Sequence, residues 1–233
     1  MSPPLRTSDR LRRGAAVAII AIVSVLLVIG VTLLPLLTPV YTRTVAGLFN
    51  PQERADLSRE RSLEMAEEVR RFVTDPDSET LPSVVDDREG FDASSVAHLA
   101  DVRDVMISAR VATGVAAGVL AIAIMLLLAR KEWRVLGAGL RGGGYMIIGA
   151  VLLLGVAGIV DFDGLFAGFH GIFFESGTWT FPSGSLLIQL FPEQFWAVSA
   201  ALWAALIAVG AGSLWWLGGY ALAHEGPHEG TRA

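Results

Sequence analysis

The sequence contains no cysteine. This excludes disulfide bonds, thiolate nucleophiles, thiolate metal sites and lipid-modified cysteines on this chain. Charge is also scarce, because only 18% of the 233 residues are Asp, Glu, Lys or Arg, against about 25% in a typical soluble domain. The formal net charge of −5 offers no basic surface for phosphates, so nucleic acid is excluded as a partner.

Four long stretches lack charged residues altogether, at residues 14–37, 111–129, 142–160 and 197–218. About 20 apolar residues in an α-helix cross the ~30 Å hydrocarbon layer of a membrane. We therefore predict an all-α membrane protein with four transmembrane helices at about residues 14–37, 109–129, 142–160 and 197–218. Gly142–Gly144 suit close packing of the third helix. A transporter is disfavoured, because ionisable residues inside spans commonly mark ion pathways.

The basic residues are distributed unevenly between the segments that connect these spans. Residues 1–13 and 130–141 each hold four Lys or Arg residues, whereas residues 161–196 hold none. Lys and Arg gather on the cytoplasmic side of membrane proteins. We therefore place residues 1–13, 130–141 and 219–233 in the cytoplasm, and expect residues 1–233 to form a single membrane domain. The first span is too long for the apolar region of a signal peptide and is interpreted as a retained anchor.

The outer loops 38–108 and 161–196 are expected to form a helical extracytoplasmic cap. In the first loop, a helix is predicted from Pro51 to Val73 with Asn50 as its N-cap, ending at Asp75–Asp77. Its apolar stripe should be buried and its charged face solvated; the stripe is Leu57, Met65, Val69, Phe72 and Val73. A second helix should begin near Asp92 or Ser94 and continue through His98 into the second span.

The second outer loop holds ten of the twenty aromatic residues of the chain. We predict a short helix, a turn around Ser176–Gly184 and a second short helix ending at Pro192. Aromatic rings and apolar helical faces with few charges favour the membrane interface, so this segment is expected to lie against the outer leaflet. The alternative is that the aromatic residues form a belt that only anchors the protein.

Only four histidines occur, at positions 98, 170, 224 and 228. His98 and His170 fall in the two outer loops, each near acidic residues, and an imidazole can accept and return a proton near neutral pH. His224 and His228 lie in the cytoplasmic tail and are expected to be inert. A metal site from His98, His170 and carboxylates is possible but has no ligand-spacing signature. For proton transfer, the paired rings must lie within hydrogen-bond or one-water reach; a separation above about 10 Å would exclude it.

Two motifs around these histidines are similar to a known family. The run from Phe166 to Phe174 around His170, followed by Trp179, Pro182 and residues 187–195, resembles the second outer loop of that family. The run from His98 to Val105 resembles the histidine and Asp-Val motif before its second span. The family is the four-span bacterial membrane proteins that include the lipoprotein intramolecular transacylase, Lit.

The resemblance implies an acyl transfer on bacterial lipoproteins in the cytoplasmic membrane, from a glyceryl ester to the amine of the N-terminal cysteine. His98 and His170 would be catalytic, Asp101 would orient a histidine, and Glu175 and Trp179 would line the site. No metal or other cofactor is expected, and the partners are membrane lipids and diacylglyceryl lipoproteins. The alternatives are a non-enzymatic membrane scaffold and a metal-dependent lipid hydrolase. The sequence does not indicate how many copies assemble.

Overall fold

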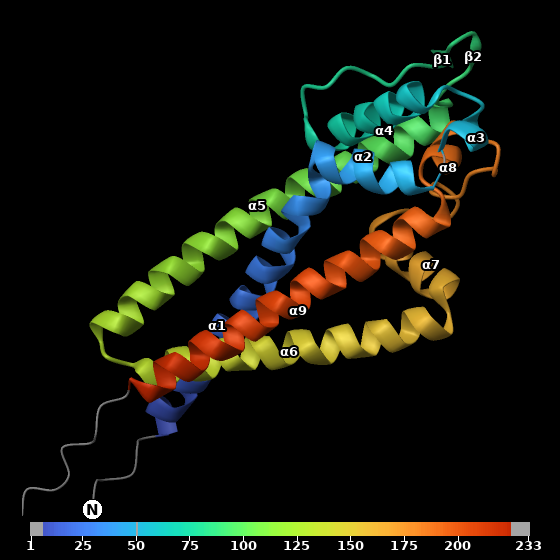
Figure 1. Cartoon of the computed structure of the whole chain (residues 1–233). Helices are drawn as coiled ribbons and strands as arrows, with labels where there is room; N and C mark the ends of the chain where they lie inside the picture. The colour runs from blue at the N-terminus through green and yellow to red at the C-terminus, as the bar shows by residue number, and fades with distance from the viewer. Residues whose placement is uncertain (1–6, 50, 225–233) are drawn as a thin grey trace, which may run out of the picture. The chain divides into compact units, whose positions relative to one another are not determined.

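The computed structural model describes residues 7–49 and 51–224, most of which are helical (Figure 1). Four helices within these residues are long and apolar enough to cross a membrane. They are α1 (Thr7–Leu33, extended to Leu37 by the 3₁₀ helix η1, Leu34–Leu37), α5 (Ala93–Ala129), α6 (Trp133–Val160) and α9 (Glu193–Ala223). The all-α class with four candidate spans is therefore confirmed.

The described residues divide into two compact units, and each is treated separately. The first unit contains residues 7–32, 112–153 and 205–224, and its buried core is aliphatic. Glycines let its helix backbones approach closely: a Cβ on Gly143 would lie 3.0 Å from the Ala21 carbonyl oxygen, and one on Gly144 would lie 3.0 Å from that of Ala211. Close contact through small residues is typical of membrane helix packing, so the role predicted for these glycines is confirmed.

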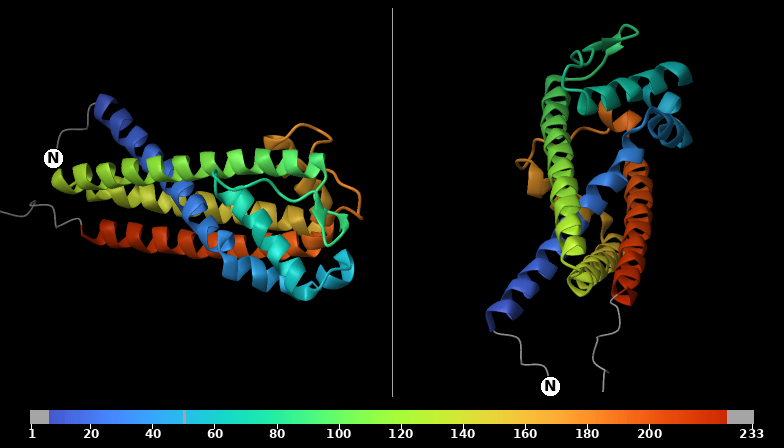
Figure 2. Two further views of the ribbon diagram at one scale, coloured as in Figure 1. Left: turned by 90° about the horizontal axis from the view of Figure 1, so that it is seen from above. Right: turned by 90° about the vertical axis from the view of Figure 1, so that its left-hand side faces the viewer.

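The second unit contains residues 33–49, 51–111 and 154–204, and its first part is built around α2 (Pro39–Leu48) and α4 (Arg59–Thr74). These two helices pack against each other, as the views of Figure 2 also show. Thr38 caps α2 by accepting a hydrogen bond from the Tyr41 amide at 3.3 Å. We did not predict α2, although a threonine followed by a proline is a recognised helix start.

The single helix predicted over residues 51–73 is wrong, because the chain forms two helices there. α3 (Pro51–Ala55) ends before Asp56, whose φ of 51° is left-handed and incompatible with a continuing helix. Ser58 then caps α4 by accepting from the Arg61 amide at 3.1 Å. Asn50, the predicted cap, lies outside the described residues. The end of the helix is confirmed, since α4 stops at Thr74 and Asp75 is its C-cap.

The predicted apolar stripe of α4 is buried at Met65, Val69 and Phe72. The charged face is not uniformly solvated, which corrects the prediction for Glu67. This residue is only 7% exposed, and its carboxylate accepts from Arg70 at 2.6 Å and lies 3.5 Å from Arg71. Burial disfavours its ionised form, but the hydrogen bonds and charges of the two arginines outweigh burial, so the pKa of Glu67 lies below its ordinary value.

A two-stranded hairpin that the sequence analysis did not predict follows α4. Strands β1 (Val84–Val85) and β2 (Arg88–Glu89) pair antiparallel through a turn in which Asp86 and Asp87 have φ of 49° and 62°. Two positive φ angles are what a tight hairpin of this kind requires. Each strand has only two residues, so the all-α class still holds.

The remaining elements of this unit carry the candidate site. α5 begins where predicted, because Asp92 accepts from the Ser95 amide at 2.8 Å. In the second outer loop, α7 (Phe162–Phe173) and α8 (Leu186–Leu190) flank an irregular segment, which confirms the predicted helix, turn and helix. The second helix ends at Leu190, two residues before the predicted Pro192. Asp161 caps α7 by accepting from the Gly164 amide at 2.8 Å.

Candidate active site

The structure brings His98 and His170 together, although 72 positions separate them in the sequence. His98 lies in the first turns of α5 and His170 in the last turn of α7, both within the second unit. Their ring centroids are 6.1 Å apart and the rings are tilted by 32°. This separation meets the geometric requirement for a pair that cooperates through one small bridging group.

Aromatic rings surround both imidazoles. The ring centroid of His98 lies 4.8 Å from that of Phe174 and 5.5 Å from that of Phe181. Around His170, the ring centroids lie at 4.1 Å for Phe166, 4.8 Å for Trp179, 5.5 Å for Phe169 and 5.7 Å for Phe174. Phe174 therefore contacts both histidines. We call these five rings, Phe166, Phe169, Phe174, Trp179 and Phe181, the aromatic surround; they lower the polarity of the environment of each imidazole.

One hydrogen bond determines the tautomer of His170. Its Nδ1 lies 2.8 Å from the carbonyl oxygen of Phe166, one helical turn earlier. A carbonyl oxygen only accepts, so Nδ1 carries the proton and Nε2 of the neutral ring has the free lone pair. His98 is more deeply buried, at 8% exposed, and its Nδ1 has no hydrogen-bond partner.

Burial of the two imidazoles disfavours their charged forms. His98 lies outside the charge-free stretch 111–129 of its helix; burial lowers its pKa, the nearby His170 lowers it further, and Asp101 raises it in part. Burial also lowers the pKa of His170, and this outweighs the opposite effect of the hydrogen bond to Phe166. Both rings are therefore set to be neutral at pH 7, the form in which an imidazole accepts a proton.

An open hollow of about 390 Å³ adjoins the pair and is lined by Asp101, Asp104, Val105, Phe173, Phe174, Glu175 and Thr178. Phe174 connects this hollow to the histidines, since it contacts both of their rings. Two of the predicted site residues, Asp101 and Glu175, line this hollow. Within the described part of the chain, no hydrogen bond joins Asp101 to His98, and the aspartate is exposed. Its negative charge raises the pKa of His98 in part, and the orienting role of Asp101 stays a prediction.

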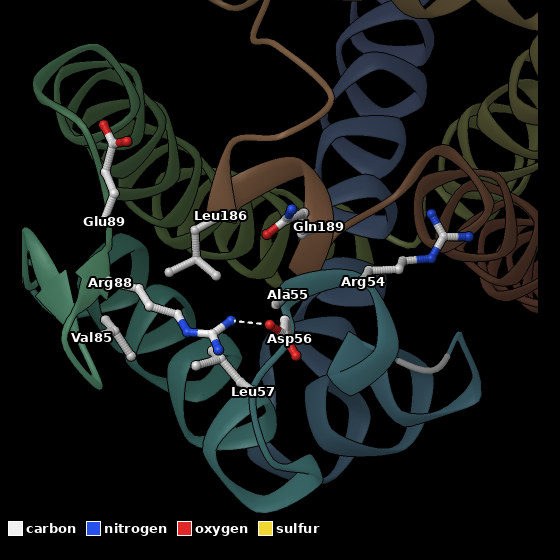
Figure 3. Close-up of a pocket in the computed structure, with 9 residues that line it drawn as sticks. All are labelled: Arg54, Ala55, Asp56, Leu57, Val85, Arg88, Glu89, Leu186 and Gln189. Atoms are coloured by element: carbon white, nitrogen blue, oxygen red, sulfur yellow. Dashed lines mark hydrogen bonds and ion pairs between the residues drawn. The ribbon is translucent and has the colours of Figure 1, made fainter.

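A second hollow, of about 250 Å³, lies between α3, the β1–β2 hairpin and α8 (Figure 3). Arg88 crosses it to form an ion pair with Asp56, and Arg54 and Gln189 also line it. None of the site residues predicted from the sequence, His98, His170, Asp101, Glu175 and Trp179, lines this hollow. The candidate site is therefore the histidine pair with the acidic hollow.

Among residues 7–49 and 51–224, no group of three or more His, Asp or Glu side chains could hold a metal ion. His224 belongs to the first unit, where its Nδ1 is 2.9 Å from the Tyr220 carbonyl oxygen. His228 lies outside the described residues. Nothing in the sequence pattern pointed to Phe181 as a neighbour of His98, because the two residues are 83 positions apart and only the folded loop brings them together.

Comparison with known proteins places this arrangement in context. The fold is similar to that of the membrane-integral lipoprotein intramolecular transacylase Lit of Bacillus cereus, with a TM-score of 0.77 and 15% identity over 91% of this chain and 96% of that protein. A variant of the same protein with histidine replaced by arginine matches with a TM-score of 0.73 and 15% identity, over 92% of this chain and 94% of the variant. No curated protein matches the chain in sequence.

The family comparison covers most of the chain. The description of the family is lipoprotein intramolecular transacylase Lit, and its model matches residues 16–196, which include both histidines and the whole aromatic surround. The chain therefore belongs to the Lit family of integral membrane proteins.

Proposed function

We propose that this protein is a membrane transacylase that acts on bacterial diacylglyceryl lipoproteins. It would move an acyl chain from the glyceryl ester to the α-amino group of the N-terminal cysteine and leave a lyso-form lipoprotein. Membership of the Lit family supports this proposal. The observation that carries it is the pair His98 and His170, whose ring centroids lie 6.1 Å apart inside an aromatic surround.

The chemistry needs proton transfer but no nucleophile from the protein. The substrate supplies both the amine and the ester, so the amine nitrogen attacks the ester carbonyl carbon and the bond to the glycerol oxygen then breaks. A base must take one proton from the nitrogen, and an acid must supply one to the departing glycerol oxygen. Neither step requires a cysteine or a metal, so the residues of this chain suffice.

The tautomer of His170 makes it the candidate base. Its Nδ1–H is engaged by Phe166, which leaves the lone pair of Nε2 for the amine proton. Burial lowers the pKa of His170, so the neutral form prevails at pH 7. The proton that His170 takes then passes through one bridging group to His98, and the protonated His98 supplies it to the glycerol oxygen, which returns both rings to the neutral state.

The surroundings of the pair suit a substrate that is both charged and lipid-anchored. A free α-amine is largely protonated below its pKa of about 7.7–8.0, and the carboxylates of Asp101, Asp104 and Glu175 line the adjoining hollow. The bound ammonium would release its extra proton to solvent in this open hollow before the neutral amine attacks the ester. Three exposed apolar residues of α7, Phe169, Ile172 and Phe173, are 48%, 75% and 47% exposed. An exposed apolar helical face favours the membrane interface, from which an acyl-anchored substrate would arrive laterally.

The proposed setting is the bacterial cytoplasmic membrane, with residues 1–233 as one membrane domain. Both termini and residues 130–141 would face the cytoplasm, and residues 38–108 and 161–196 would face outward. The basic residues in 130–141 and their absence from 161–196 support this orientation. The histidine pair would then lie on the extracytoplasmic side, where matured lipoproteins are anchored.

The test is to incubate the purified protein in lipid with a purified diacylglyceryl lipoprotein and fragment the N-terminal peptide by mass spectrometry. Transacylation conserves the intact mass and moves one acyl chain onto nitrogen, whereas a hydrolase would lower the mass. His98→Ala and His170→Ala should each abolish the change. His224→Ala is the matched control, because this histidine belongs to the first unit and makes the same type of backbone contact there. An unchanged peptide with wild-type protein would support a non-enzymatic scaffold instead.

A further inference from the structure

The indole of Trp179 has an unusual feature for a residue beside a candidate catalytic pair. Its Nε1 atom is buried and has no hydrogen-bond partner. An indole N–H is a donor only, and a buried donor without a partner destabilises a fold, so native proteins rarely keep one without a reason. Of the six such buried side-chain atoms in the described residues, two belong to this cluster, Nε1 of Trp179 and Nδ1 of His98.

The loop between α7 and α8 holds this indole against His170. The ring centroids of Trp179 and His170 are 4.8 Å apart, and that of Phe166 lies 6.3 Å from the indole. The chain turns directly before Trp179: Gly177 has a φ of 89°, and the amide and hydroxyl of Thr178 donate to the Glu175 carbonyl oxygen at 3.2 Å and 2.9 Å. The position of the indole is therefore built into the loop.

We infer that the Nε1–H of Trp179 binds the oxygen of the ester carbonyl and stabilises the negative charge that this oxygen gains during acyl transfer. The inference rests on the proposed function. When the amine nitrogen bonds to the carbonyl carbon, the π electron pair moves onto the oxygen, and His170 takes a proton from the nitrogen. His170 passes this proton to His98, the C=O bond re-forms as the bond to the glycerol oxygen breaks, and the protonated His98 gives its proton to that oxygen. Trp179 donates a hydrogen bond throughout and loses no proton.

This assignment explains why the site keeps a tryptophan rather than a phenylalanine. A phenyl ring would make the tilted contact with His170 and the edge-on contact with Phe166 without leaving a buried donor. A donor aimed at a developing oxyanion in a site of low polarity is among the strongest catalytic devices, and removal of one such donor lowers kcat by about 10²–10³-fold in a well-studied protease. A neutral indole on an ester oxygen should act in the same direction.

The test uses two variants at position 179. The first is Trp179→Phe. The second carries, at this position alone, the tryptophan analogue in which sulfur replaces the N–H group, which keeps the bicyclic shape. Each should convert the diacylglyceryl lipoprotein at least ~10-fold more slowly than wild type, while the melting temperature stays equal or rises because a buried orphan donor has been removed. The matched control is Trp196→Phe, because the Nε1–H of Trp196 already donates to the Phe191 carbonyl oxygen at 3.0 Å. Its conversion rate should stay within about twofold of wild type, since no donor to substrate is lost.

Two results would overturn the inference, and they are distinguishable. If wild type converts the substrate and the sulfur analogue converts it equally fast, Trp179 donates nothing to the reaction while the transacylase proposal stands. If wild type itself fails to convert the substrate, the proposed function fails and this inference fails with it.

Discussion

The N-cap of α7 provides a sharp test of how the loop positions His170. The Asp161 carboxylate accepts from the Gly164 amide at 2.8 Å. α7 has twelve residues, and none of them is buried. Helices this short are marginal without tertiary packing, so the cap should matter more here than in a core helix. We expect Asp161→Ala to loosen α7 and Asp161→Asn to preserve it, because Asn and Asp cap about equally well.

The expected magnitude follows from the single bond that is lost. Replacing a capping residue by alanine costs about 1 kcal/mol, which corresponds to an approximately fivefold larger opening equilibrium for α7. Hydrogen exchange followed by mass spectrometry on the peptide that contains residues 162–173 measures that opening directly. The conversion rate of the lipoprotein substrate should fall by no more than about fivefold. Protein molecules in which α7 has opened would not react, whereas those in which α7 is formed would keep an intact site.

Two further variants decide whether the cap is the cause. Asp163→Ala removes a carboxylate from the same turn without touching the cap and should leave exchange nearly unchanged. Gly164→Ala should resemble Asp161→Ala, because a Cβ at this position would lie 2.1 Å from a carboxylate oxygen of Asp161. The reasoning is refuted if Asp161→Ala exchanges at the wild-type rate, or if Asp163→Ala exchanges as fast as Asp161→Ala.

Three other predictions concern charge, pH and packing. Glu67→Ala should destabilise by about 1.5–3 kcal/mol, since the partly buried Arg70 guanidinium loses its charged hydrogen-bond partner, and lower the melting temperature by roughly 3–12 °C. Glu64→Ala, whose ion pair is exposed, should cost less than ~1 kcal/mol, and equal shifts would contradict this. Because burial lowers the pKa of His170, this base should stay neutral below pH ~6.5, the ordinary imidazole pKa. The substrate amine itself titrates at about pH 7.7–8.0, so the conversion rate is divided by the fraction of free amine at each pH. The corrected rate should persist below pH ~6.5 and fall only at lower pH; a midpoint above ~6.5 in the corrected rate would exclude a buried base. Gly137→Ala, whose Cβ would meet a backbone oxygen at 2.7 Å, should cost about 1–3 kcal/mol, whereas Gly149→Ala has open space and should not lower the melting temperature.

The membrane-crossing helices were predictable because their signal is an absence of charge over about twenty residues. That signal depends on the energy of placing ions in hydrocarbon and hardly on neighbouring helices. The start of α5 was predictable for a similarly local reason, since the Asp92 carboxylate reaches the Ser95 amide within one turn. Predictions of this kind succeed where a few adjacent residues contain the whole physical cause.

The break between α3 and α4 was missed because a continuous charged pattern conceals a left-handed residue. The sequence analysis did not consider Ser58 as a cap, and Asp56, two residues earlier, gave no reason to expect a φ of 51°. The burial of Glu67 was missed because it depends on contacts between distant parts of the chain. One of these is the hydrogen bond that Arg70, the partner of Glu67, donates to the Leu37 carbonyl oxygen 33 positions earlier. A charged helix face is usually exposed to solvent, and only the tertiary contacts show that Glu67 is not.

The two histidines of the candidate site were predictable from the sequence, whereas the aromatic contacts around them were not. His98 and His170 stood out because the chain has only four histidines and these two fall in the predicted outer loops. The motifs around them also resemble those of the family. The contacts of His98 with Phe174 and Phe181 depend on how the loop after α7 folds back. The unpartnered indole of Trp179 has no sequence signature at all, because a missing partner is a property of the folded arrangement.

The most direct test of the central claim is fragmentation mass spectrometry of the N-terminal peptide of a diacylglyceryl lipoprotein after incubation with the purified protein. The account predicts a peptide of unchanged intact mass that carries one acyl chain on the cysteine nitrogen and one fewer on the glyceryl group. It also predicts that His98→Ala and His170→Ala leave the substrate as it was. A free amine with both ester chains in place after incubation with wild-type protein, or full conversion by either histidine variant, would contradict the account.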